Sequence, residues 1–163
     1  MTHIALAAGF ALFLWWLTTG VVLYLNHLPP RTYRWSLAGA TVLFAASLYG
    51  LLASRAELSF AGALHAFACA LLLWAWLEMS YLMGIVTGPN KAPCPPGARG
   101  WRRFVLALRT SLYHELAVVA VGLAVLALLW DAPNRLGAWT FLALWLLRWS
   151  AKRGFGMGPS GGR

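Results

Sequence analysis

The chain has 163 residues, of which 61% are hydrophobic and only 10% are charged, and its mean hydropathy is +0.68. A soluble domain carries about 25% charged residues, so this composition excludes an ordinary soluble protein and indicates one integral membrane domain. The net charge of +9 comes from basic residues clustered between hydrophobic segments. Such clustering indicates membrane topology and leaves no basic surface for binding nucleic acid. We therefore expect an all-α fold, a polytopic membrane helix bundle of about five transmembrane helices in contact with the lipid bilayer.

The first two hydrophobic segments cover residues 4–25 and 35–53 and contain no acidic residue. Each is long enough to cross a bilayer core of about 30 Å, and Pro29-Pro30 separates them because proline ends a helix. The second segment carries small residues that would let helix backbones approach closely in lipid: Ala38, Gly39, Ala45, Ala46 and Gly50. A short turn around Arg55 and Glu57 follows.

The third segment covers residues 60–86 and is closed by Thr87-Gly88-Pro89. A loop rich in proline, glycine and basic residues follows, and its Cys94 is expected to be a plain loop thiol. The fourth segment covers residues 104–130, and a turn at residues 131–135 leads to a fifth at residues 136–149. Arg148 near the end of the fifth segment is expected to snorkel to the membrane surface. Residues 1–153 thus form a transmembrane domain, and the glycine-rich residues 154–163 are expected to be a disordered tail.

Basic residues alternate between the connections in a way that predicts orientation. Eleven fall on one side of the membrane: Arg31, Arg34, Lys91, Arg99, Arg102, Arg103, Arg109, Arg148, Lys152, Arg153 and Arg163. The opposite side has only Arg55 and Arg135. The positive-inside rule then predicts an N-terminus outside and a C-terminus in the cytoplasm. Five tryptophans near segment ends fit the interfacial aromatic belt: Trp35, Trp101, Trp130, Trp139 and Trp149.

Three ionisable residues lie inside the third and fourth segments, where charge is costly and marks a function or a specific helix contact. Glu78 lies in the third segment, and His114 and Glu115 lie in the fourth at a comparable predicted depth. Ser111, Glu115, Val118 and Gly122 share one helix face that would allow close packing against another helix.

Three interpretations of these residues stay open. Glu78 could pair with His114 or Tyr113 in a hydrogen-bonded cluster that fixes helix register. The group could hold a metal or the magnesium of a pigment, since imidazole and carboxylate are suitable ligands. It could also serve as a proton relay or catalytic pair. His65 lies about 220° around the helix from Glu78 and faces another way.

The central motif resembles the PuhE-type proteins of purple phototrophic bacteria. The similarity covers residues 10–152 and is carried by residues 74–84 (WAWLEMSYLMG), 87–89 (TGP), 94–95 (CP), 100–104 (GWRRF) and 113–115 (YHE). Such proteins are described as photosynthetic complex assembly proteins encoded near the reaction-centre H subunit. Family chains continue into further spans beyond Lys152, so the resemblance implies that this chain is shortened at its C-terminus.

The resemblance implies a non-enzymatic assembly factor for the reaction centre and core antenna in a bacterial inner membrane, whether cytoplasmic or intracytoplasmic. Its partners would be photosynthetic complex subunits or a pigment. The residues name no cofactor, and bacteriochlorophyll or a precursor is the candidate that the resemblance suggests. Glu78, His114, Glu115 and His65 are the candidate cofactor-binding residues, with no catalytic residue assigned. The alternative is a membrane enzyme acting on a lipid-soluble pigment precursor at Glu78 and His114.

The distribution of basic residues makes the topology testable. Reporter fusions placed after Ala98 and after Lys152 should be active in the cytoplasm, and a fusion after Asn134 should be active in the periplasm. Cytoplasmic activity of the Asn134 fusion would contradict the five-span arrangement.

Overall fold

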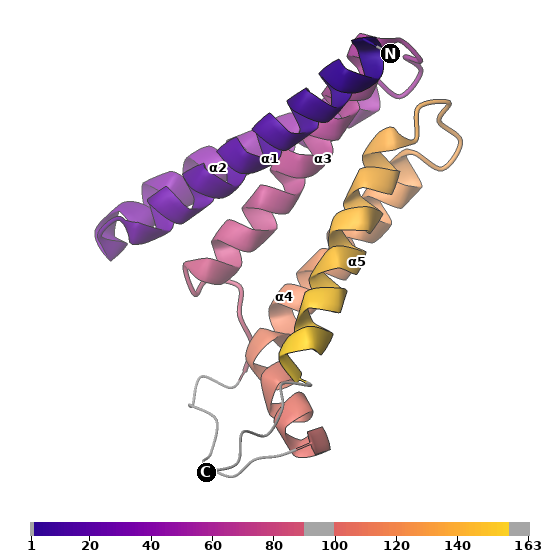
Figure 1. Cartoon of the computed structure of the whole chain (residues 1–163). Coiled ribbons are helices and arrows are strands. Elements are labelled where there is room, and N and C mark those ends of the chain that lie inside the picture. The colour runs from indigo at the N-terminus through magenta and orange to yellow at the C-terminus, as the bar shows by residue number, and fades with distance from the viewer. Residues whose placement is uncertain (1, 90–99, 157–163) are drawn as a thin grey trace.

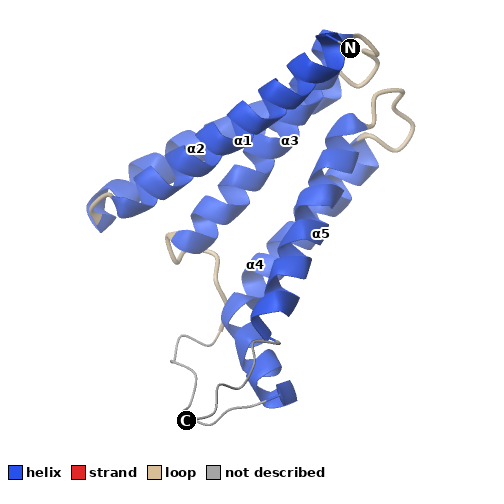
Figure 2. Ribbon diagram, in the orientation of Figure 1, coloured by secondary structure: helices blue, strands red, loops and turns tan. Residues whose placement is uncertain are grey.

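The structure, a computed structural model, describes residues 2–89 and 100–156. The elements in chain order are α1 (Thr2–His27), the short 3-10 helix η1 (Pro30–Thr32), α2 (Tyr33–Ala53), α3 (Phe60–Leu82), α4 (Gly100–Leu128) and α5 (Leu136–Gly156). Figure 2 shows helices joined by loops throughout the described chain. The expected all-α fold is confirmed.

The helices run up and down, and α3 is the central one. It contacts α1, α2, α4 and α5. The N-terminus, the α2–α3 turn and the α4–α5 turn lie together at the upper end of Figure 1. Helix α3 lies between α1 and α2 on one side and α4 and α5 on the other, and the lower ends of α1 and α2 lie away from those of α4 and α5 (Figure 1). Successive helices therefore run in opposite directions, as the alternating distribution of basic residues predicts.

Four segments of the described chain are long and apolar enough to cross a membrane: Thr2–His27, Pro30–Ala53, Phe60–Leu82 and Arg109–Leu128. These segments support a multi-pass membrane protein. Helix α5 packs beside α3 and α4. The count of five spans and the orientation of the bundle stay predictions.

Two helix ends differ from the sequence-based expectation. Helix α3 ends at Leu82, because Gly84 takes a φ of +73° and closes a Schellman-type cap. The N–H of Ile85 donates to the Ser80 carbonyl at 3.0 Å, and the N–H of Gly84 donates to the Tyr81 carbonyl at 2.9 Å. Glu78 consequently lies one turn, about 6 Å, from the end of its helix.

Helix α5 runs on to Gly156, past residue 149 and into the stretch expected to be a disordered tail. Residues 157–163 and Cys94 lie outside the described residues.

The upper end of the bundle is held by the buried Asn134 in the α4–α5 turn. Its N–H donates to the Arg55 carbonyl at 3.0 Å, and its Nδ2 donates to the Gly62 carbonyl at 3.3 Å and the Ser54 carbonyl at 3.5 Å. Its Oδ1 accepts from the N–H of Leu136 at 3.2 Å, so the side chain also caps the start of α5. One side chain thereby fastens the α4–α5 turn to the α2–α3 turn.

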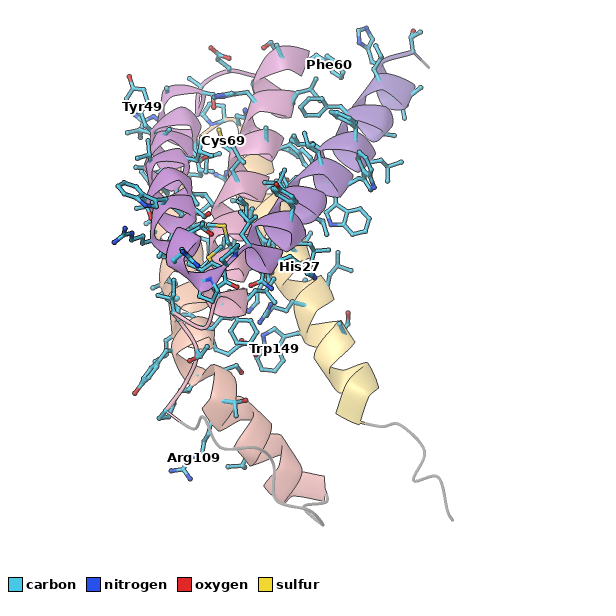
Figure 3. All side chains as sticks on the ribbon, turned by 90° about the vertical axis from the view of Figure 1, so that its left-hand side faces the viewer. His27, Tyr49, Phe60, Cys69, Arg109 and Trp149 are labelled. Carbon is cyan, nitrogen blue, oxygen red and sulfur yellow. The ribbon has the colours of Figure 1, made fainter. Side chains whose placement is uncertain are left out.

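Close backbone approach between helices depends on glycine at one position of α2. A Cβ on Gly50 would lie 2.8 Å from Cys69 Sγ and 3.1 Å from His65 Cε1 of α3. The other small residues of α2 that were expected to pack, Ala38, Gly39, Ala45 and Ala46, are exposed. Figure 3 shows Cys69 between the helices, whereas Tyr49 points away from them.

The segment after α3 lies directly on α4. The Thr87 carbonyl accepts a hydrogen bond from the His114 N–H at 3.0 Å. A Cβ on Gly88 would overlap the Arg109 carbonyl oxygen and lie 2.7 Å from the carbonyl carbon of Thr110. Only glycine fits here, and the contact fixes α4 against the end of α3.

The substitution Gly88→Ala should therefore destabilise the protein by about 1–3 kcal/mol, since the new methyl group must displace the α4 backbone. Gly39→Ala is the matched control, because its Cβ would meet nothing within 4 Å. Unfolding in mixed micelles with increasing denaturing detergent measures both. Equal stability of the two variants would contradict the close contact of Gly88 with α4.

Candidate functional site

A cluster of polar side chains joins three helices near the lower end of α3. Glu78 comes from α3, Glu115 from α4 and Arg148 from α5. Nη1 of Arg148 donates to Oε1 of Glu78, and Nε of Arg148 lies 3.9 Å from Oε1 of Glu115. The guanidinium therefore lies between two carboxylates from different helices.

Two rings extend the cluster from Arg148 to His114. The guanidinium carbon lies 5.2 Å from the centroid of the Tyr81 ring, within cation–π range. The Tyr81 ring lies 4.7 Å from the His114 ring at an interplanar angle of 47°. His114 is fully buried, with no exposed surface, and its main chain is held by Thr87. Tyr81 thus connects the ion pair to the buried imidazole.

The charged groups of the cluster are largely shielded. Side-chain exposure is 14% for Arg148, 24% for Glu78 and 11% for Glu115. Removing charges from water is costly, and a carboxylate left alone there would be strongly unfavourable. The Glu78 carboxylate is therefore stabilised by Arg148, and Glu115 lies close enough to add to the negative charge around the guanidinium.

This arrangement corrects one expectation and supports another. In one of the three interpretations Glu78 pairs with His114 or Tyr113, but in the structure it pairs with Arg148, while Tyr113 is 53% exposed. The Arg148 side chain was expected to snorkel to the membrane surface. In the structure it points into the bundle, where the carboxylates of Glu78 and Glu115 attract it. The α4 face was predicted correctly, since its four residues are all buried: Ser111, Glu115, Val118 and Gly122. Phe141 of α5 fills the space beside Gly122.

His65 lies outside the cluster. It is exposed on α3, and its Nε2 lies 3.7 Å from Sγ of Cys69 one turn away. The structure thus brings together Glu78, His114 and Glu115 of the candidate residues and separates His65 from them. Arg148 and Tyr81 are the members that sequence reasoning missed.

The centre of the cluster is occupied by the protein's own cation. Within the described chain, no three His, Cys, Asp or Glu side chains converge as metal ligands. Glu78 and Glu115 both approach the Arg148 guanidinium. The geometry is that of a charge-paired helix junction.

Glu78 also borders an open groove between α1 and α3. The groove has a volume of about 170 Å³, and its walls include Trp15 and Thr19 of α1 and Trp74 of α3. Trp74 is held from behind by an edge-to-face contact with Phe141, with ring centroids 5.5 Å apart. One side of the Glu78 carboxylate is therefore accessible from the membrane-facing surface, while the other is fixed by Arg148.

The ion pair can be measured by a double-mutant cycle. Glu78→Leu and Arg148→Leu should each cost roughly 2–3 kcal/mol, below the about 3–5 kcal/mol of a fully buried pair because Glu78 is partly exposed. The double variant should lose less than the sum of the two. Arg55→Leu combined with Glu78→Leu is the control cycle and should be additive, because the two sites lie at opposite ends of the bundle. Additivity of the Glu78 and Arg148 changes would contradict the pairing.

Comparison with known proteins places the chain in a family. The chain is 33% identical over 151 residues to an uncharacterized 30.4 kDa protein in the puhA 5′ region of Rhodobacter capsulatus, an alignment that covers 90% of this chain and 55% of that protein. The chain thus spans about half the length of this relative. No solved structure matches significantly. A family model described as a protein of unknown function, DUF3623, matches residues 1–158, and the chain belongs to this family.

Proposed function

We propose that this protein is a PuhE-type, non-enzymatic membrane assembly factor for the photosynthetic reaction centre and its core antenna. It binds a complex subunit, or bacteriochlorophyll or a precursor, against its membrane-facing helices. The relative in the puhA 5′ region of Rhodobacter capsulatus supports a role linked to photosynthesis. The cellular site would be the bacterial inner membrane, cytoplasmic or intracytoplasmic.

The observation that carries the proposal is the division between an internally paired polar cluster and an outward apolar surface. Along α1 only Val22 is buried, while Trp15 and Trp16 are 56% and 71% exposed. Large aromatic side chains supply contact area at low entropic cost, which suits binding of another helix or a flat pigment ring. A surface of this kind supports docking.

The polar cluster inside the bundle also supports an assembly function, because it holds helices together. The Glu78–Arg148 pair joins α3 to α5, and the 3.9 Å approach of Arg148 to Glu115 adds α4. His114, which the enzyme alternative would need beside a substrate, has no exposed surface. Side chains that hold helices in register give a rigid docking platform, whereas general acid–base work requires reach to the substrate.

Removing the polar residues separates an assembly factor from an enzyme. With Glu78→Gln and His114→Ala together, an assembly factor should lower the amount of core complex while the pigment pool keeps its chemical composition. An enzyme should instead leave a distinct pigment precursor. Absorption spectra of membranes and chromatography of extracted pigments report the two quantities, with the amount of the variant checked by immunoblot.

A second variant keeps this test independent of folding. Trp16→Ala changes an exposed side chain outside the cluster, so the protein should accumulate normally while the core complex declines. A new precursor peak in the first variant, with assembly restored by added product, would overturn the proposal in favour of the enzyme.

A further inference from the structure

A second groove lies at the opposite end of the molecule, between the end of α4 and the start of α5. It has a volume of about 160 Å³. Its apolar lining includes Leu126 from α4 and Ala138 and Leu142 from α5. This volume is well below the roughly 300–1,000 Å³ of pockets that enclose a whole small molecule. The groove therefore suits one hydrocarbon chain of a larger amphiphile.

Two tryptophans and one arginine complete the groove. Trp130 and Trp139 both line it and are 72% and 64% exposed. Arg135 also lines it, from the turn between the helices. Tryptophans are enriched at the ends of membrane-spanning helices, at the level of lipid headgroups. In the predicted five-span arrangement, the groove therefore starts at the membrane surface and runs toward the hydrocarbon.

The Arg135 guanidinium is held in place by the turn. Its Nε donates to the Ala132 carbonyl at 3.2 Å. The turn itself is fastened to the α2–α3 connection through Asn134. Among the described residues no carboxylate forms an ion pair with Arg135, so its two Nη groups remain as donors in the planar fork that suits phosphate oxygens.

We propose that this groove binds a phospholipid, with the phosphate on Arg135 and one acyl chain on the aliphatic floor between Trp130 and Trp139. The lining contains one cation, Arg135, and no acidic residue, so its charge favours an anionic phosphate headgroup. The apolar floor favours a hydrocarbon acyl chain. The site is separate from the Glu78 cluster and does not depend on the proposed assembly function.

The experiment uses the full chain in detergent micelles and native mass spectrometry. Phosphatidylglycerol should give a one-to-one adduct, whereas diacylglycerol with the same acyl chains should not, because it lacks the phosphate. Arg135→Gln should reduce the bound fraction of phosphatidylglycerol by about tenfold, the loss expected for one charge-assisted phosphate contact.

Arg55→Gln is the matched control. Arg55 is an exposed arginine in the α2–α3 turn at the same end of the bundle, but it does not line the groove. It should leave the adduct unchanged. Trp139→Ala removes an exposed wall of the groove and should weaken binding of the lipid, while leaving the fold intact.

Three results would overturn the inference. Equal losses in Arg135→Gln and Arg55→Gln would show only general attraction of lipid to basic residues. Equal retention of diacylglycerol and phosphatidylglycerol would show that the phosphate is not recognised. An adduct with inorganic phosphate that excludes the lipid would assign Arg135 to a free anion.

Discussion

The ion pair between Glu78 and Arg148 is the constraint on which the placement of α5 depends. The α2–α3 and α4–α5 turns meet at the upper end (Figure 1), where Asn134 joins them. Below that joint, α5 packs along α3 and α4 and has a further polar connection. The guanidinium supplies that connection on the lower part of α3, and the Trp74–Phe141 contact fills the space between the two polar joints.

The value of this pair lies more in specificity than in stability. A shielded ion pair loses most of its Coulomb energy to desolvation, and apolar residues of similar size often stabilise a protein equally well. A wrong helix rotation, however, would leave a carboxylate or a guanidinium alone in an apolar environment. Because Arg148 approaches Glu115 as well as Glu78, one rotation of α5 places the guanidinium near carboxylates of both α3 and α4. We infer that the cluster fixes helix register.

Hydropathy and helical periodicity were sufficient to predict the helices and the buried face of α4. Both features follow from the order of residues within one segment of the chain. The pairing of Glu78 was not accessible in this way. An arginine near the end of a hydrophobic segment ordinarily snorkels, and only the three-dimensional order of the helices brings Arg148 to α3. The end of α3 was misplaced because Pro89 is the stronger sequence signal. Gly84 stops the helix earlier through a positive φ that the sequence does not reveal.

Glu78 is partly exposed and belongs both to the polar cluster and to the proposed docking surface beside α1. Its carboxylate borders the groove beside α1 and accepts from Arg148 of α5 at the same time. A ligand or partner helix that donated a hydrogen bond to Glu78 from the groove would compete with Arg148 for negative charge. A purely apolar occupant would shield the pair from water and strengthen it. An occupant of the α1–α3 groove would therefore contact the same carboxylate that holds α5.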